Sequence, residues 1–92
     1  MTAQWTDEQD VDATLRAVLV DVLGLAPAQV AGFDDTTGLF GALPEFDSMA
    51  VAGLLSELEE RLGILIEDDE VEAEMLESYG RLSSFIRAKA LQ

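Results

Sequence analysis

Residues 47–68 read DSMAVAGLLSELEERLGILIED, and this stretch decides the fold. From position 48 to position 62 the apolar residues recur at the spacing of one helix face, as in a helix that buries one side. Gly63 is a stop signal, and either Asp47 or Ser48 can cap the first turn with a side-chain oxygen. The stretch therefore predicts an amphipathic helix over residues 48–62, whose buried stripe is Val51, Leu54, Leu55, Leu58 and Leu62.

Two further long helices and one short one are predicted. The first runs over residues 7–23, after a capping box formed by Thr6 and Gln9. The last runs over residues 79–90 behind Ser78 as its N-cap. Residues 68–75 are acid-rich and predict a helix of no more than two turns. The inward-facing residues are Val11, Leu15, Val18, Leu19 and Val22 in the first helix, Val71 and Met75 in the short one, and Leu82, Phe85 and Ile86 in the last.

The connections are predicted to be loops. Gly24 and Pro27 end the first helix, and residues 30–44 contain glycines and a proline without a sustained period. Asp34-Asp35 is expected to form a turn. The run Ile64-Leu65-Ile66 has no second strand to pair with and is expected to pack on the core as an extended segment. The side chains expected to pin the long loop are Phe33, Leu39, Phe40 and Leu43.

The size and charge of the chain limit what it can be. Its 92 residues fit one small domain, residues 1–92, with residues 1–5 expected to be flexible. Five basic and 19 acidic residues give a net charge of -14, which repels nucleic acid and favours partners with basic surfaces. No apolar run approaches the roughly 20 residues that span a bilayer, and the polar N-terminus is unlike a signal peptide. We expect a soluble, cytoplasmic, all-α monomer.

Catalysis and metal binding find little support in the composition. The chain has no His and no Cys, so a general base would be a carboxylate, and a domain this small offers little cleft to raise its pKa. The acidic run at residues 67–70 lacks the alternating acids and central Gly of a calcium loop. We therefore expect neither an enzyme nor a specific metal site.

Residues 47–68 resemble the acyl carrier protein family. The family's pattern is Asp-Ser-Leu, then an apolar-striped helix that ends in consecutive Glu, then an apolar-acidic stretch, and residues 47–68 align with it without a gap. The resemblance extends more loosely to the first helix, the long loop, the short acidic helix and the last helix that opens with Ser78-Tyr79. It implies an acyl-carrier-like four-helix bundle with three longer helices, a short third helix and a long loop between the first two.

The resemblance implies a function for Ser48. In the family this serine carries 4′-phosphopantetheine, which a separate magnesium-dependent phosphopantetheinyl transferase takes from coenzyme A, and Asp47 is its motif neighbour. A phosphodiester suits the start of a helix, where backbone N–H groups and the helix dipole favour an anion. The carrier would then hold acyl chains as thioesters and present them to acyl-loading and acyl-transferring enzymes.

Two groups of residues take roles from the same resemblance. Met49, Glu57, Glu59 and Glu60 would dock the basic patches of partner enzymes, although a solvated face is the simpler interpretation of the acids. Residues 45–77 contain twelve acids and one base, Arg61. The second group, which would shelter a fatty chain or simply form core, is Leu54, Leu58, Ile66 and Leu76.

The sequence departs from the family at three positions. Met49 replaces the usual Leu, a mild change, whereas Ala50 and Gly53 stand where fatty-acid-synthesis carriers have acids. These two predict weaker docking to general fatty acid synthase enzymes and a dedicated partner in lipid, polysaccharide or secondary-metabolite assembly. Residues 38–64 are most similar to free-standing carriers of exosortase and exopolysaccharide clusters. Two alternatives stay open: an aminoacyl or peptidyl carrier of the same plan, and an unmodified acidic interaction module in which Ser48 is only a cap.

Overall fold

The structure is a computed structural model that describes residues 8–91. The described chain forms four α-helices: α1 (Glu8–Leu23), α2 (Pro27–Ala31), α3 (Ser48–Leu62) and α4 (Tyr79–Ala90). Two short 3-10 helices, η1 (Asp68–Glu70) and η2 (Ala73–Leu76), lie between α3 and α4. Within residues 8–91 no helix is long and apolar enough to cross a membrane. The predicted capping box of Thr6 and the predicted flexibility of residues 1–5 lie outside the described residues.

The helix bounds follow from local signals. Both α3 and α4 have the predicted ends, and α1 ends at Leu23 as predicted. The side chain of Ser78 caps α4 by accepting a hydrogen bond from the Arg81 N–H. Gly63 ends α3 in the left-handed conformation, with φ of 65°, which a residue without Cβ adopts at low cost.

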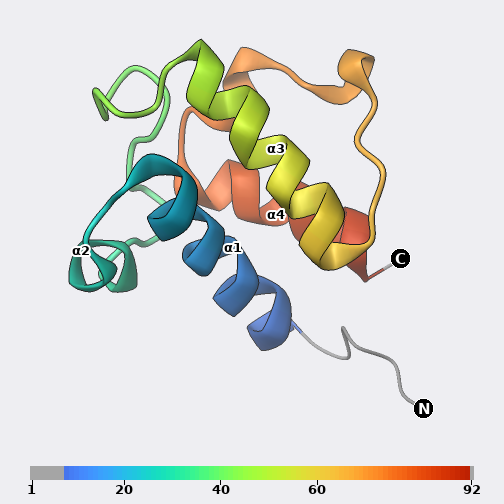
Figure 1. Cartoon of the computed structure of the whole chain (residues 1–92), viewed down its shortest axis with the longest axis horizontal. Helices are drawn as coiled ribbons and strands as arrows, with labels where there is room; N and C mark the ends of the chain where they lie inside the picture. The colour runs from blue at the N-terminus through green and yellow to red at the C-terminus, as the bar shows by residue number, and fades with distance from the viewer. Residues whose placement is uncertain (1–7, 92) are drawn as a thin grey trace.

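The core lies where α1 meets α3 and α4 (Figure 1). Four of the five predicted α1 residues are buried, and Val22 is half-buried. Of the predicted stripe of α3, Leu54, Leu58 and Leu62 are buried, and Val51 and Leu55 are half-buried. Apolar burial of this kind is the main stabilising contribution in a small domain. The α4 residues of the core are Tyr79, Leu82 and Ile86, with Phe85 half-buried.

The long loop is more ordered than the sequence predicts. It contains α2, a helix of five residues that starts with Pro27 and buries Val30. Proline is well suited to the first helical turn because the N–H that it lacks has no partner there. Sequence reasoning treated Pro27 only as a stop signal for α1 and missed the helix that it starts.

The part of the loop that leads toward α3 runs alongside the start of α4. The Leu39 N–H donates to the Glu77 carbonyl at 2.8 Å, and the Tyr79 N–H donates to the Thr37 carbonyl at 2.8 Å. Phe33 and Leu39 are buried as predicted, whereas Leu43 is half-buried and Phe40 is 38% exposed. The loop is thus pinned by backbone pairing as well as by apolar side chains.

The Asp34-Asp35 turn is confirmed. Oδ1 of Asp34 accepts hydrogen bonds from the N–H and the hydroxyl of Thr36, at 2.9 and 2.7 Å, and these bonds lower the pKa of Asp34. The next carbonyl, that of Asp35, accepts a bond from the N–H of Gly80. A Cβ at Gly80 would lie 2.8 Å from that oxygen, so the close approach of the turn to α4 requires glycine.

The segment between α3 and α4 differs in detail from the prediction. The expected short third helix takes the form of η1 and η2, which extended residues separate. Val71 and Met75 are half-buried. In the apolar run after α3, Ile66 is buried as predicted, but the prediction is wrong for Leu65, which is 66% exposed. An extended backbone turns successive side chains to opposite sides, so Ile66 and Leu65 cannot both face the core.

Candidate functional site

Ser48 is the first residue of α3, and its side chain is exposed. The residue before it makes the cap: Oδ1 of Asp47 accepts a hydrogen bond from the Ala50 N–H at 2.8 Å. Sequence reasoning left open which of the two side chains caps the helix. Because Asp47 does so, the Ser48 hydroxyl is not needed to satisfy the first turn.

The local electrostatics at Ser48 favour an anion. The start of α3 presents backbone N–H groups and the positive end of the helix dipole. The first turn of α3 contains no acidic residue. Ala50 is one of the uncharged residues of this turn, and the carboxylate of Asp47 lies immediately before Ser48. A phosphate ester on the Ser48 oxygen would therefore meet favourable backbone groups, with no acid from the first turn of α3.

Met49 projects into solvent beside Ser48. Its side chain is 85% exposed, more than any other large hydrophobic side chain among the described residues. The structure thus brings Met49 and Ser48 together at one end of α3.

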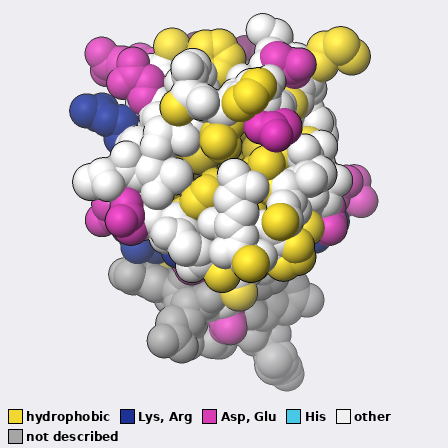
Figure 2. Space-filling model, turned by 90° about the vertical axis from the view of Figure 1, so that its left-hand side faces the viewer, with side chains coloured by type: hydrophobic (Ala, Val, Ile, Leu, Met, Phe, Trp, Pro, Cys, Tyr) yellow, Lys and Arg dark blue, Asp and Glu magenta, His cyan; other side chains and the backbone are white. Residues whose placement is uncertain are grey.

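Two hollows open beside Ser48. The loop groove has a volume of about 520 Å³ and is mostly apolar; it is lined by Phe40, Gly41, Ala42, Leu43, Pro44, Phe46, Asp47 and Ser48. The helix groove, on the side of η2, has a volume of about 230 Å³ and is lined by Phe40, Ser48, Val51, Val71, Glu72, Ala73 and Leu76. Figure 2 shows hydrophobic side chains gathered in the middle of the face on the side of α2 and the loop, with acidic side chains beside them and at its margins. Sequence reasoning did not find Phe46, although an aromatic residue beside the Asp-Ser pair was the available signal.

The predicted docking acids are not equivalent. Glu57 forms an ion pair with Arg61 at 2.9 Å, one turn further along α3. The carboxylate of Glu59 accepts a hydrogen bond from the Ile66 N–H at 2.8 Å, which ties the segment after α3 back to the helix. Glu60 is exposed. Glu59 therefore has a structural role that the sequence did not reveal.

The predicted lining residues all belong to the core. Leu54, Leu58, Ile66 and Leu76 are buried in one apolar cluster. Leu76 also reaches the surface of the helix groove. Leu54, Leu58 and Ile66 do not line that groove.

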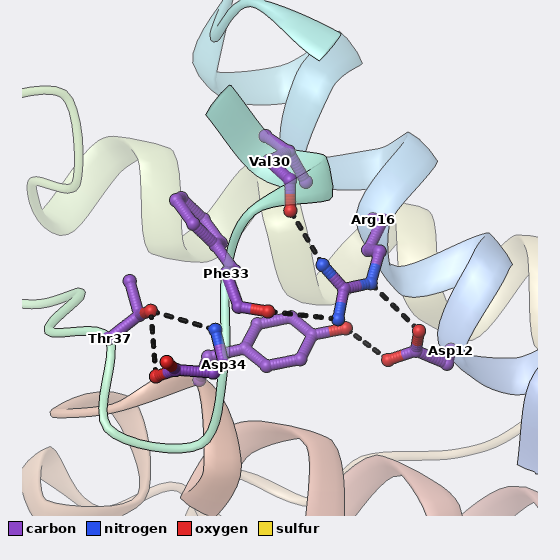
Figure 3. Close-up of polar contacts among 7 residues, drawn as sticks. Asp12, Arg16, Val30, Phe33, Asp34 and Thr37 are labelled. Atoms are coloured by element: carbon purple, nitrogen blue, oxygen red, sulfur yellow. Dashed lines mark hydrogen bonds and ion pairs between the residues drawn. The ribbon is translucent and has the colours of Figure 1, made fainter. Parts of the chain in front are cut away.

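A polar cluster that the sequence did not reveal holds the loop against α1 and α4 (Figure 3). The guanidinium of Arg16 donates to the carbonyls of Val30 and Phe33, at 2.6 and 3.1 Å, and to the Asp12 carboxylate at 2.7 Å. It also lies over the ring of Tyr79, 4.6 Å from the ring centre. The Tyr79 hydroxyl donates to Asp12, and burial together with this bond raises the pKa of Tyr79.

The acidic run at residues 67–70 is used within the fold. Glu70 accepts a hydrogen bond from the Glu67 N–H and pairs with Lys89 of α4 at 2.7 Å. The bond with Lys89 is the main cause that lowers the pKa of Glu70. In the described part of the chain no group of three or more His, Cys, Asp or Glu side chains is placed to hold a metal ion.

Comparison with known proteins defines the class. The chain matches the family described as the phosphopantetheine attachment site over residues 13–86, and it belongs to this family. It is also similar to the solution NMR structure of a holo acyl carrier protein from Nitrosomonas europaea, with 35% identity and a TM-score of 0.75. That match covers 87% of this chain and 94% of the other. Comparison with curated proteins gave no significant match.

These findings confirm the predicted family, its all-α bundle and its prosthetic group. The protein is a carrier, not an enzyme, and it bears covalently attached 4′-phosphopantetheine. A carrier of this family interacts with a phosphopantetheinyl transferase and with acyl-handling enzymes. The residues around α3 fit the group, because an exposed hydroxyl stands at a helix start that favours an anion, next to apolar grooves.

Proposed function

We propose that Ser48 bears the 4′-phosphopantetheine arm and that the protein holds acyl intermediates as thioesters for partner enzymes. The observation that carries this proposal is that Asp47 caps α3, which leaves the side chain of Ser48 exposed and without a capping role. When bound, the arm supplies a thiol, which the chain lacks because it has no Cys. The residues of the chain position the phosphodiester and keep acids out of the first turn of α3.

The proposed docking surface runs along α3, from Met49 at its start to the three acids near its end. Met49 is its apolar part, and Glu60 is its most accessible acid among the three predicted on α3. Glu57 and Glu59 contribute charge while bonded to Arg61 and to the Ile66 N–H. Long-range attraction between this acidic surface and a basic patch would mainly raise the association rate. Its expected partners are acyl-loading and acyl-transferring enzymes of a specialised lipid, polysaccharide or secondary-metabolite pathway.

The attachment site is tested by loading the apo protein. Incubation with coenzyme A, magnesium and a broad-specificity phosphopantetheinyl transferase should add the mass of one phosphopantetheine, as measured by intact-protein mass spectrometry. Ser48→Ala should abolish the addition. Ser56→Ala is the matched control, because Ser56 is an exposed serine further along α3, and it should load like the parent protein. An unmodified parent, or loading that survives Ser48→Ala, would contradict the assignment.

A second prediction concerns Ala50 and Gly53. Acids introduced at both positions should increase the turnover of the holo protein by general fatty acid synthase enzymes, because they add charge to the docking surface. Position 50 lies in the first turn of α3, where an acid also suits the helix dipole, whereas a Cβ at position 53 would lie 3.4 Å from Cγ1 of Val22. Ala50→Glu is therefore the cleaner test. Ala50→Gln is its uncharged control, and equal turnover of the two variants would rule out the charge explanation.

A further inference from the structure

Phe40 divides the surface around Ser48 into two compartments. Both the loop groove and the helix groove include Ser48, and Phe40 is the only other residue that lines both. An arm attached to the Ser48 oxygen therefore starts at the boundary of two hollows and can extend into either one. Because the arm is attached at that boundary, we take the arm, and not another molecule, as the occupant of one of the two hollows.

The larger volume of the loop groove favours it over the helix groove. Its volume of about 520 Å³ lies within the range of about 300–1,000 Å³ that is usual for small-molecule sites, whereas the helix groove has about 230 Å³. The lining of each groove includes one acid, Glu72 in the helix groove and Asp47 in the loop groove, so charge does not distinguish the two.

Contacts within the chain hold the walls of the loop groove. Phe46 is only 2% exposed and meets Phe40 edge to face, with 6.2 Å between the ring centres. The backbone on either side is held as well, because the Phe40 N–H donates to the Leu76 carbonyl and the Leu43 N–H donates to the Leu39 carbonyl. A preformed wall binds a flexible chain at a lower entropic cost than a wall that must order first.

We propose that the loop groove is the resting seat of the prosthetic arm, with Phe40 keeping the arm out of the helix groove. The arm has two geminal methyl groups close to its phosphate, and these would pack against Phe40, Leu43 and Phe46. Its amides, further along, would remain near the open side of the groove. This inference rests on the proposed attachment of the arm to Ser48.

The test uses the holo protein, made with isotope-labelled protein and an unlabelled arm. Mass spectrometry first establishes loading at Ser48, so that a failure of the attachment site is seen separately. Isotope-filtered NOE spectra should then connect the geminal methyl groups to ring protons of Phe40 and Phe46. NOEs to Val71 and Ala73 instead, or no NOE from a fully loaded arm, would overturn the proposed seat.

A variant of the dividing side chain provides an independent readout. Phe40→Ala should weaken the NOEs to Phe46 and produce new ones to Val71 and Ala73, because it joins the two grooves. Leu65→Ala is the matched control: it also shortens an exposed apolar side chain, but Leu65 lies beyond the other end of α3 and should leave the NOEs unchanged. Far-UV circular dichroism checks that both variants keep their helices. An identical NOE pattern in folded Phe40→Ala would exclude Phe40 as the divider.

Discussion

Leu54→Ala is expected to lower the free energy of unfolding by about 2–5 kcal/mol, the range measured for leucine-to-alanine changes in closed cores. Leu54 has no exposed surface and lies in the middle of α3, in the apolar cluster that joins this helix to α1 and α4. The loss combines the transfer of the missing methyl groups with the cavity that they leave. In a domain of this size such a loss is a large part of the total stability, which is typically about 5–15 kcal/mol.

Urea unfolding followed by circular dichroism measures this loss, with the apo protein used throughout. Leu65→Ala is the control, because its side chain is 66% exposed and its removal creates no cavity. The transition midpoint of Leu54→Ala should fall well below that of the parent, while that of Leu65→Ala should stay close to it. Equal midpoints for the two variants would show that α3 does not pack as described.

The helices could be predicted because their signals are local. Asp47, Ser78 and Gly63 lie next to the ends that they determine, and the apolar residues between them repeat at helical spacing. Helix α2 gave no such signal, because five residues are too few for a period to show and Pro27 is also the usual residue after a helix end. The two 3-10 helices were predicted as one short helix for the same reason of length.

Long-range polar contacts could not be predicted. Arg16 bonds to carbonyls 14 and 17 residues ahead, and the Tyr79 hydroxyl reaches Asp12 across 67 residues of sequence. No spacing rule connects such positions. The resemblance of residues 47–68 to a family pointed to Ser48 as the attachment serine. The sequence could not predict that Asp47 caps α3 and leaves Ser48 exposed, or that two grooves meet at Ser48.

The Arg16 cluster is the second place where one substitution should have a large effect. A guanidinium presents several N–H donors in a fixed plane, and here they serve two loop carbonyls and one carboxylate at the same time. The Val30 carbonyl belongs to α2, and the Phe33 carbonyl to the turn that follows it. Arg16 therefore joins α1 to the beginning of the long loop that ends at Ser48.

Arg16→Met is expected to destabilise the protein by about 2 kcal/mol. Hydrogen bonds that involve a charged group contribute about 1.5–3 kcal/mol each, and the partial exposure of the Arg16 side chain reduces their contribution here. Arg16→Lys should recover only part of the loss, since an ammonium cannot reach both carbonyls and Asp12 in one plane. Arg61→Met is the control: it removes two surface ion pairs, with Asp21 and with Glu57, and should change the urea midpoint far less. Amide hydrogen exchange should locate the effect, with faster exchange at Phe33 and Leu39 in Arg16→Met but not in Arg61→Met. Unchanged exchange at these two amides would mean that the backbone pairing with α4, and not Arg16, holds the loop.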